Sequence, residues 1–203
     1  MEHYFTNNSG LKSEFRSVYL HIFDETLEFT SDLGVFSKDK VDYGSKLLIE
    51  TFLKEEKNYE SVLDLGCGYG VIGLTVAKYK GVSVTLADVN KRALHLTSIN
   101  AKNLKLNVSI VESDIYSNID GCFDVILTNP PIRAGKSVIT KFIMDASKHL
   151  NNNGTLYVVM RKDQGAKSMM ETMKSIYNVN ILEKSKGFYI IKAKLIDKQI
   201  ICW

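Results

Sequence analysis

The chain has 203 residues, of which 45% are hydrophobic and 24% are charged, as expected for one globular domain with a substantial buried core. Its N-terminal residues lack the basic and then apolar order of a signal peptide, and no apolar run approaches the ~18 residues that a membrane span needs. We therefore expect a cytoplasmic protein that has no membrane partner.

Cysteine and histidine spacing gives no sign of a disulfide or a metal site, because the cysteines are odd in number and lack CxxC spacing. The residues concerned are Cys67, Cys122, Cys202, His3, His21, His95 and His149. We predict neither a disulfide nor a bound metal.

Charge is distributed unevenly along the chain. Residues 1–60 carry 7 Lys and Arg against 12 Asp and Glu, whereas residues 133–203 carry 13 against 5. A basic C-terminal third suits a polyanionic partner, although a solvated lysine-rich face gives the same pattern.

The predicted elements begin with short strand-like pieces at 18–23 and 26–29 and a helix that starts near Tyr43. From residue 58 onward, apolar runs rich in β-formers alternate with helical patterns. The strands are expected near 60–65, 82–88, 107–112, 122–128 and 154–160. The helices that alternate with them are expected near 70–80, 90–103, 137–150 and 164–177.

These connections are long enough for parallel β-α-β units, so the pattern predicts a doubly wound, Rossmann-like α/β sheet. Asn153-Gly154 is interpreted as the turn that ends the helix near 137–150. The last two strands, near 179–184 and 188–195, are expected to form an antiparallel hairpin. We predict a mostly parallel seven-stranded sheet in a core over 59–203, with a short N-terminal β/α elaboration over 1–58 packed on it.

A glycine-rich segment, DLGCGYG, follows the first core strand and opens into an apolar helix. Glycines there let a ligand approach the backbone closely, and the helix N-terminus favours an anionic group. The loop residues expected to contact a ligand are Gly66, Cys67, Gly68 and Gly70. A structural turn is one alternative, and the dinucleotide fingerprint GxGxxG, which the same letters spell, is another. Asp64, just before the loop, argues against both alternatives. Its negative carboxylate would repel the pyrophosphate of a dinucleotide, whereas it would attract the ammonium group of a methionine moiety.

Acidic residues also follow the next two strands. Asp88, with Val89 behind it, could accept hydrogen bonds from both ribose hydroxyls of S-adenosylmethionine or NAD. Asp114 could accept a hydrogen bond from an adenine amino group while Ile115 packs on the ring. The alternative for Asp114 is a solvent-exposed strand end.

The fourth core strand ends in TNPPI, which contains both prolines of the chain. Proline has a fixed φ and no amide hydrogen, so the pair holds the backbone rigid and leaves carbonyl oxygens as acceptors. The Asn129 side-chain oxygen and the Pro130 carbonyl can each accept one N–H of an exocyclic amine, while Pro131 shapes the pocket. Such bonds draw the nitrogen toward a pyramidal geometry whose lone pair can attack a methyl group. A plain strand-terminating turn is the alternative.

Right-handed crossovers place all these segments along one edge of the sheet. The predicted order is Asp114, Asp88, the glycine loop and Asn129, which is the chemical order adenine, ribose, methionine and acceptor. With ~4.8 Å between strands, three gaps span ~14 Å, about the reach of the donor and its target. The arrangement favours S-adenosylmethionine over NAD.

With these motifs, the chain resembles the class I methyltransferases, and specifically single-domain relatives of the RsmC family of small-subunit ribosomal RNA guanine-N2 methyltransferases. The resemblance runs through GVFSKDKVDYGSKLL, VLDLGCGYGVIGL, ADVNKRAL, TNPPIRAGK, RKDQGAKSM and KGFYIIKAK. It implies S-adenosylmethionine as the methyl donor and S-adenosylhomocysteine as the product. It also implies that the N-terminal segment lines the donor pocket, which points to Phe36 and Ser37. The alternatives are core packing for Phe36 and a helix cap for Asp42.

The chain departs from the family in two ways. Many NPP methylases have an aromatic residue after the second proline to stack on a flipped base, where Ile132 offers only an apolar contact. Longer bacterial members carry a second, degenerate methyltransferase-like half that aids RNA docking. Here we expect recognition to come from the edges of the core, from the first 58 residues or from a partner subunit.

Basic residues near the acceptor side are candidate RNA contacts. Arg133 and Lys136, at the start of the next helix, could hold a phosphate or the guanine edge, unless they are simply a solvated helix start. Four lysines recur at even spacing on the final hairpin, so one face could follow an RNA backbone, although a solvated face explains them equally well. These are Lys184, Lys186, Lys192 and Lys194.

The sequence therefore predicts direct in-line methyl transfer to the N2 amine of a guanine in small-subunit (16S) ribosomal RNA, without metal. The partner is ribosomal RNA or the small ribosomal subunit, and the protein itself is a monomer or a homodimer. One alternative keeps the same chemistry on an adenine N6 or a protein glutamine. Another is a non-catalytic RNA-binding module that retains the fold.

Overall fold

A computed structural model describes residues 12–55 and 58–196, so His3 and Cys202 lie outside the described residues. The N-terminal elements are β1 (Arg16–Ile22), β2 (Glu25–Ser31) and α1 (Tyr43–Lys54). The central elements are β3 (Ser61–Leu65), α2 (Val71–Lys80), β4 (Ser83–Asp88), α3 (Lys91–Asn103), β5 (Ser109–Glu112) and β6 (Phe123–Thr128). The remaining ones are α4 (Lys136–Met144), β7 (Leu150–Arg161), α5 (Ala166–Met173), β8 (Tyr177–Ser185) and β9 (Phe188–Leu195).

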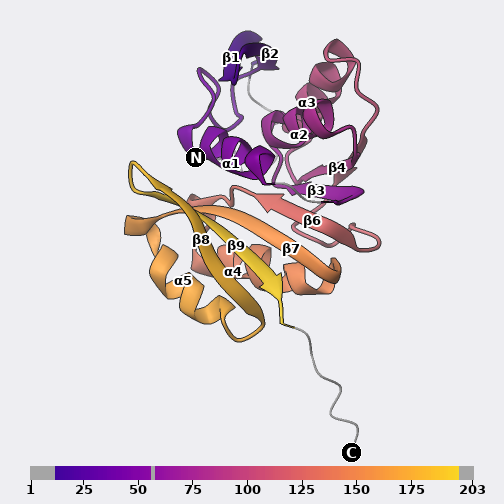
Figure 1. The fold of residues 1–203 in the computed structure, drawn as a ribbon. Coiled ribbons are helices and arrows are strands. Elements are labelled where there is room, and N and C mark those ends of the chain that lie inside the picture. The colour runs from indigo at the N-terminus through magenta and orange to yellow at the C-terminus, as the bar shows by residue number, and fades with distance from the viewer. Residues whose placement is uncertain (1–11, 56–57, 197–203) are drawn as a thin grey trace, which may run out of the picture.

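Seven strands form one sheet in the order β5-β4-β3-β6-β7-β9-β8 (Figure 1). The strands from β5 to β7 are parallel, whereas β9 runs antiparallel to both β7 and β8. The predicted doubly wound sheet with a C-terminal antiparallel hairpin is confirmed. Because the chain returns from β5 to the other side of β3, the carboxyl ends of β3 and β6 flank the crevice at which the strand order reverses.

Helices cover both faces of this sheet, with α1, α2 and α3 on one face and α4 and α5 on the other (Figure 1). Alternate residues of each central strand therefore enter different cores: Val62 of β3 packs in the first core and Leu63 in the second. Both side chains are 0% exposed. Burial on both faces explains why the central strands are continuous apolar runs instead of alternating patterns.

The N-terminal strands form a separate antiparallel hairpin. Val18, Leu20 and Ile22 of β1 are buried in alternation with exposed residues, as expected for a strand with one solvated face. The side-chain amide of Asn100 in α3 fixes the hairpin, because it accepts a hydrogen bond from the Thr30 amide at 2.7 Å and donates one to the Thr30 carbonyl at 2.9 Å. The predicted strand pieces and the helix at Tyr43 are thus present, while the division at residues 58 and 59 stays a prediction.

The interpretation of Asn153-Gly154 as a helix-ending turn is wrong. The helix predicted over 137–150 ends at Met144 and is followed by a 3-10 turn, Asp145–Lys148. Asn153, with φ 67°, lies inside β7, where the pairing with β6 is irregular. Asparagine tolerates positive φ in a bulge as readily as in a helix cap, so the Asn-Gly dipeptide does not distinguish a bulge from a helix end.

Among the described residues, no helix is long and apolar enough to cross a membrane.

Candidate active site

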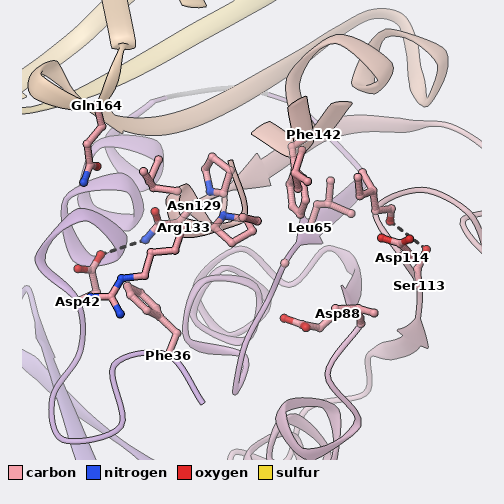
Figure 2. Close-up of a pocket in the computed structure, with 18 of the residues that line it drawn as sticks. Phe36, Asp42, Leu65, Asp88, Ser113, Asp114, Asn129, Arg133, Phe142 and Gln164 are labelled. Atoms are coloured by element: carbon pink, nitrogen blue, oxygen red, sulfur yellow. Dashed lines mark hydrogen bonds between the residues drawn. The ribbon is translucent and has the colours of Figure 1, made fainter. Parts of the chain in front are cut away.

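The carboxyl ends of the central strands open into one cavity of about 470 Å³. In Figure 2, Asp88 and Asp114 lie toward one end of it and Asn129 and Asp42 toward the other. Eleven of the predicted site residues line this cavity. They are Phe36, Gly66, Asp88, Val89, Asp114, Ile115, Asn129, Pro130, Pro131, Ile132 and Arg133. The sheet topology thus brings together segments that are nearly 100 residues apart in the sequence.

Asp64 lies beneath the glycine loop instead of on the cavity wall, and it is 0% exposed. Its Oδ2 accepts a hydrogen bond from the Gly73 amide at 2.7 Å, whereas Oδ1 has no hydrogen-bond partner among the described residues. Burial, with a smaller contribution from the neighbouring Asp88, raises the pKa of Asp64 to about 7. Asp64 is therefore a buried, incompletely satisfied acceptor directly below the loop.

The three glycines of the loop have different surroundings. Gly68 has φ 58° and no atom within 4 Å of the position of a Cβ, so its open side can receive a ligand. Gly70, with φ 92°, begins α2 and faces inward, because a Cβ there would lie 2.8 Å from Leu74 Cδ1. Gly66 lines the main cavity, whereas Gly70 lines none of the cavities described and supports the loop by close packing.

A smaller recess of about 40 Å³ adjoins the main cavity beside the loop. Ser37, Cys67 and Gly68 line it, and Phe36 lines both spaces. Phe36 is 39% exposed, which excludes the core-packing alternative. Burial raises the pKa of the Cys67 thiol well above its ordinary value, so this cysteine is a neutral wall of the recess and not a nucleophile.

Asp88 ends β4 with its carboxylate held by the backbone. Its Oδ2 accepts a hydrogen bond from the Gly68 amide and its Oδ1 from the Asn90 amide, each at 2.9 Å. Burial raises the pKa of Asp88 against the opposing effect of these bonds. Each carboxylate oxygen keeps a further lone pair, so Asp88 can accept two more hydrogen bonds from a diol in the cavity.

The segment after β5 forms the far end of the cavity. Ile115 has φ 55°, and the buried Ser113 hydroxyl donates to its carbonyl at 2.9 Å. This local bond holds Ile115 against the cavity, while Asp114 is exposed at the rim. An aliphatic side chain and a rim carboxylate are suited to a heteroaromatic ring with an exocyclic amine.

Asn129 follows β6, whose end is anchored by the Thr128 hydroxyl donating to the Leu65 carbonyl at 2.8 Å. The Asn129 Nδ2 donates to Asp42 Oδ2 at 3.0 Å and to Ser45 Oγ at 2.9 Å. Both amide hydrogens are thereby engaged, which leaves Oδ1 as the polar atom that the side chain offers to the cavity. Asp42 also caps α1 by accepting from the Ser45 amide at 2.9 Å, as the helix-cap interpretation predicted.

Arg133 is exposed at the rim of the main cavity, and the half-buried Ile132 lines both this cavity and a neighbouring one. Lys136, at the first position of α4, instead lines a separate cavity with Met169 and does not reach the main one. The predicted substrate residues are therefore split between two places.

Several residues that line the cavity were not predicted as site residues from the sequence. They are Asp42, Leu65, Ser113, Ala134, Val138, Phe142, Arg161, Gln164 and Phe188. Arg161 pairs with Asp163 through two bonds of 2.9 Å and lies 5.1 Å from the centroid of the Phe188 ring. Phe188, the first residue of β9, thus supplies an aromatic face to the acceptor side of the cavity.

The expectation that four hairpin lysines share one face is wrong. The two-residue turn at Lys186 and Gly187 sets Lys184 opposite Tyr189, so these two side chains share a face. Tyr189 and Lys192 are an odd number of residues apart on β9 and so point to opposite faces. Lys192 and Lys194 share a face, but Lys192 is paired with Glu55.

No group of three or more His, Cys, Asp and Glu residues within 12–55 and 58–196 could hold a metal ion.

Comparison with known proteins agrees with this geometry. The methyltransferase small domain family matches residues 26–192, which is most of the chain. The chain belongs to this methyltransferase family. The resemblance inferred from the motifs is thus confirmed at the level of the family.

Individual relatives of this methyltransferase fall into two lengths. The uncharacterized protein YbxB of Bacillus subtilis is 44% identical, and the alignment covers 95% of this chain and 98% of that protein. Ribosomal RNA small subunit methyltransferase C of Haemophilus ducreyi is 31% identical over 80% of this chain, but over 50% of its own length. This chain therefore spans about half the length of the methyltransferase C relatives.

The solved structure of a T. thermophilus 16S rRNA N2 methyltransferase (RsmC), in complex with AdoMet and guanosine, has the same fold. The two superpose with a TM-score of 0.79 at 24% identity, over 92% of this methyltransferase and 52% of that chain.

Proposed function

We propose that this methyltransferase moves the methyl group of S-adenosylmethionine to an exocyclic amine of RNA. The observation that carries the proposal is the orientation of the Asn129 amide, whose nitrogen is fully engaged by Asp42 and Ser45 while its oxygen is left for a ligand. An amine bound there lies in the same cavity as Asp88. The cavity can therefore hold donor and acceptor together.

The lining residues fit the parts of this donor. Asp88 has spare lone pairs for the two ribose hydroxyls, and Ile115 with Asp114 suits the adenine ring and its amino group. The recess beside Gly68 suits the amino-acid end, with the helix N-terminus near its carboxylate. The buried Asp64 has an unpaired Oδ1, and an ammonium group above it would favour the ionised carboxylate against the effect of burial.

When bound, S-adenosylmethionine supplies an electrophilic methyl group on its sulfonium and leaves as S-adenosylhomocysteine. Asn129 Oδ1 and the Pro130 carbonyl accept the two N–H bonds of the acceptor amine, which turns its lone pair toward the methyl group. Pro131 and Ile132 limit the positions that the acceptor ring can take. Positioning of this kind supplies most of the rate, because the reacting atoms are held in line.

We propose guanine N2 of small-subunit ribosomal RNA as the acceptor. The names of the methyltransferase C relatives and of the T. thermophilus structure support this choice. The acceptor side of the cavity also suits a purine, because the Phe188 ring provides a stacking face and Arg133 and Arg161 provide donors for its polar edge. Phe188 takes the place of the aromatic residue that the sequence lacks after the second proline.

The test is transfer of a radiolabelled methyl group to ribosomal RNA, small ribosomal subunits and DNA in parallel. We expect incorporation into small subunits or their RNA, recovered as N2-methylguanosine after nuclease digestion. Recovery of N6-methyladenosine or methylglutamine alone would overturn the choice of guanine and leave the amine chemistry standing.

The matched variant is Asn129→Ala, which removes the acceptor oxygen and leaves the two prolines in place. We expect its methyl transfer to fall at least about 100-fold, in the range of lost positioning and polar contacts in other active sites. Binding of S-adenosylhomocysteine by Asn129→Ala should change little. Undiminished transfer would show that the chain uses another group, and no transfer by the wild type would favour a non-catalytic RNA-binding module.

A further inference from the structure

The side-chain amide of an asparagine has two orientations that differ by exchange of its oxygen and nitrogen. Only one of them serves the proposed chemistry, because an amine substrate needs the Asn129 oxygen as an acceptor. With the nitrogen turned toward the cavity, two donors would face each other. Something in the fold must therefore set the orientation of this amide before the substrate arrives.

The contacts of Asn129 identify what sets it. Its Nδ2 lies 3.0 Å from Asp42 Oδ2 and 2.9 Å from Ser45 Oγ, and Figure 2 shows the Asp42 bond reaching across the cavity wall from α1. An ionised carboxylate can only accept hydrogen bonds. In the reversed orientation, the Asn129 oxygen would face the Asp42 oxygen, which is repulsive.

Ser45 could not set the orientation by itself, because a hydroxyl both donates and accepts. Its Oγ lies 3.4 Å from Asp42 Oδ2, to which it donates. This bond directs the hydroxyl hydrogen away from Asn129 and leaves a lone pair for the second amide hydrogen. Asp42 therefore determines the polarity of both contacts.

The helix start keeps Asp42 in place. Asp42 is the N-cap of α1, with φ −62° and ψ 138°, and its Oδ2 also accepts from the Ser45 amide at 2.9 Å. A backbone N–H cannot reverse its polarity, so the position that it faces must be an oxygen. One carboxylate oxygen thus joins the end of α1 to the end of β6.

We propose that Asp42 and Ser45 are positioning residues that hold the Asn129 amide with its oxygen toward the acceptor amine. The inference rests on the proposed amine methylation. It assigns a catalytic purpose to a residue pair that helix capping alone would explain, and it makes α1 part of the acceptor site.

Asp42→Ser separates the two roles of Asp42. Serine is as good an N-cap as aspartate, but its hydroxyl is too short to reach both the Ser45 amide and Asn129. We expect kcat to fall about tenfold or more, while the thermal midpoint and the affinity for S-adenosylhomocysteine change little. A fall in kcat that is matched by an equal loss of donor affinity would overturn the proposal.

Asp42→Asn is the conservative rescue. The Ser45 amide requires an oxygen at the cap, so the asparagine carbonyl takes the place of Oδ2 and still accepts from Asn129. We expect most of the lost kcat to return, although the negative charge is absent. Activity as low as that of Asp42→Ser would show that the charge, and not the orientation, matters.

A double-mutant cycle tests whether Asp42 acts through Asn129. In an Asn129→Ala background, measured by single turnover, Asp42→Ser should cause no further loss. Additive losses would mean that Asp42 meets the substrate itself, and they would overturn the positioning role.

A readout independent of activity is the NMR signal pair of the Asn129 side-chain amide, assigned by its absence in Asn129→Ala. Both signals should shift in Asp42→Ser and one chiefly in Ser45→Ala. Unshifted signals in an active enzyme would refute the inference, whereas absence of methyl transfer by the wild type would refute only the proposed function.

Discussion

A carboxyl group as deeply buried as that of Asp64 favours its neutral form, and this links folding stability to pH. Burial raises its pKa from the ordinary 3.8 to about 7. Between these values the folded state binds more protons than the unfolded state, so the free energy of unfolding falls as pH rises. The full effect is on the order of 4 kcal/mol, since one pKa unit corresponds to about 1.4 kcal/mol.

Asp64→Asn should flatten this dependence. The asparagine oxygen can still accept from the Gly73 amide, but the side chain no longer titrates. We expect the unfolding free energy of the variant to fall less steeply between about pH 4 and pH 7 than that of the wild type, as measured by urea denaturation. Asp88, whose pKa burial also raises, contributes a residual slope in both proteins. Equal slopes would show that Asp64 is ionised in the fold throughout this range.

Asp88 and Asp114 offer a second comparison at the level of single side chains. Each charge-assisted bond to a ribose hydroxyl contributes roughly 1.5–3 kcal/mol, so Asp88→Ala should weaken binding of S-adenosylhomocysteine at least about tenfold. Asp114 is exposed at the rim, where solvent competes for its bond, and Asp114→Ala should have the smaller effect. Calorimetry on both variants measures the affinity for S-adenosylhomocysteine. A larger loss in Asp114→Ala than in Asp88→Ala would contradict the assignment of Asp88 to the ribose and Asp114 to the adenine.

At the scale of elements, the closeness of α1 to β9 shapes the acceptor side. A Cβ on Gly44 of α1 would lie 2.9 Å from the Phe188 ring and 3.0 Å from Asp42 Oδ2. Both neighbours line the cavity, so this glycine permits the helix to pack where its N-terminus can reach Asn129.

Gly44→Ala should therefore reduce methyl transfer and destabilise the fold by about 1–3 kcal/mol, the range for overpacking, even though alanine favours helices. Lys54→Ala, at the exposed end of the same helix, is the control and should leave both properties unchanged. Thermal unfolding and the methyl assay provide the measurements. A Gly44→Ala protein more stable than the wild type would contradict this prediction, because it would mean that the Phe188 ring moves aside without loss of stability.

At the scale of the whole molecule, donor binding should stabilise the fold, because the site joins loops after four strands and the N-terminal segment. At 100 times its dissociation constant, a ligand adds about 2.7 kcal/mol, or about 5–10 °C in the thermal midpoint of a chain of this length. We expect this shift with S-adenosylhomocysteine and none with NAD at the same concentration. A shift with NAD would restore the dinucleotide interpretation of the glycine loop.

The sequence by itself determined the sheet and the identity of most of its edge residues. Strand and helix periodicities are local, and right-handed crossovers leave few ways to arrange the strands, so the order of Asp114, Asp88 and Asn129 followed from chain order. The same locality explains the errors. Asn153-Gly154 is a residue pair that suits a helix cap or a bulge equally. The hairpin lysines were assigned to one face from their spacing alone, which does not include the pairing across the turn that sets Lys184 on the face opposite that of Lys192.

Only the tertiary structure decided which atoms of the site face which. It placed Asp64 under the loop, Lys136 outside the main cavity and Phe188 on the acceptor side. It also set Asp42 against Asn129, 87 residues away in the chain. Contacts of this kind depend on how helices pack against a finished sheet, and packing is fixed by the shapes of side chains from distant segments. No pattern within one segment carries that information.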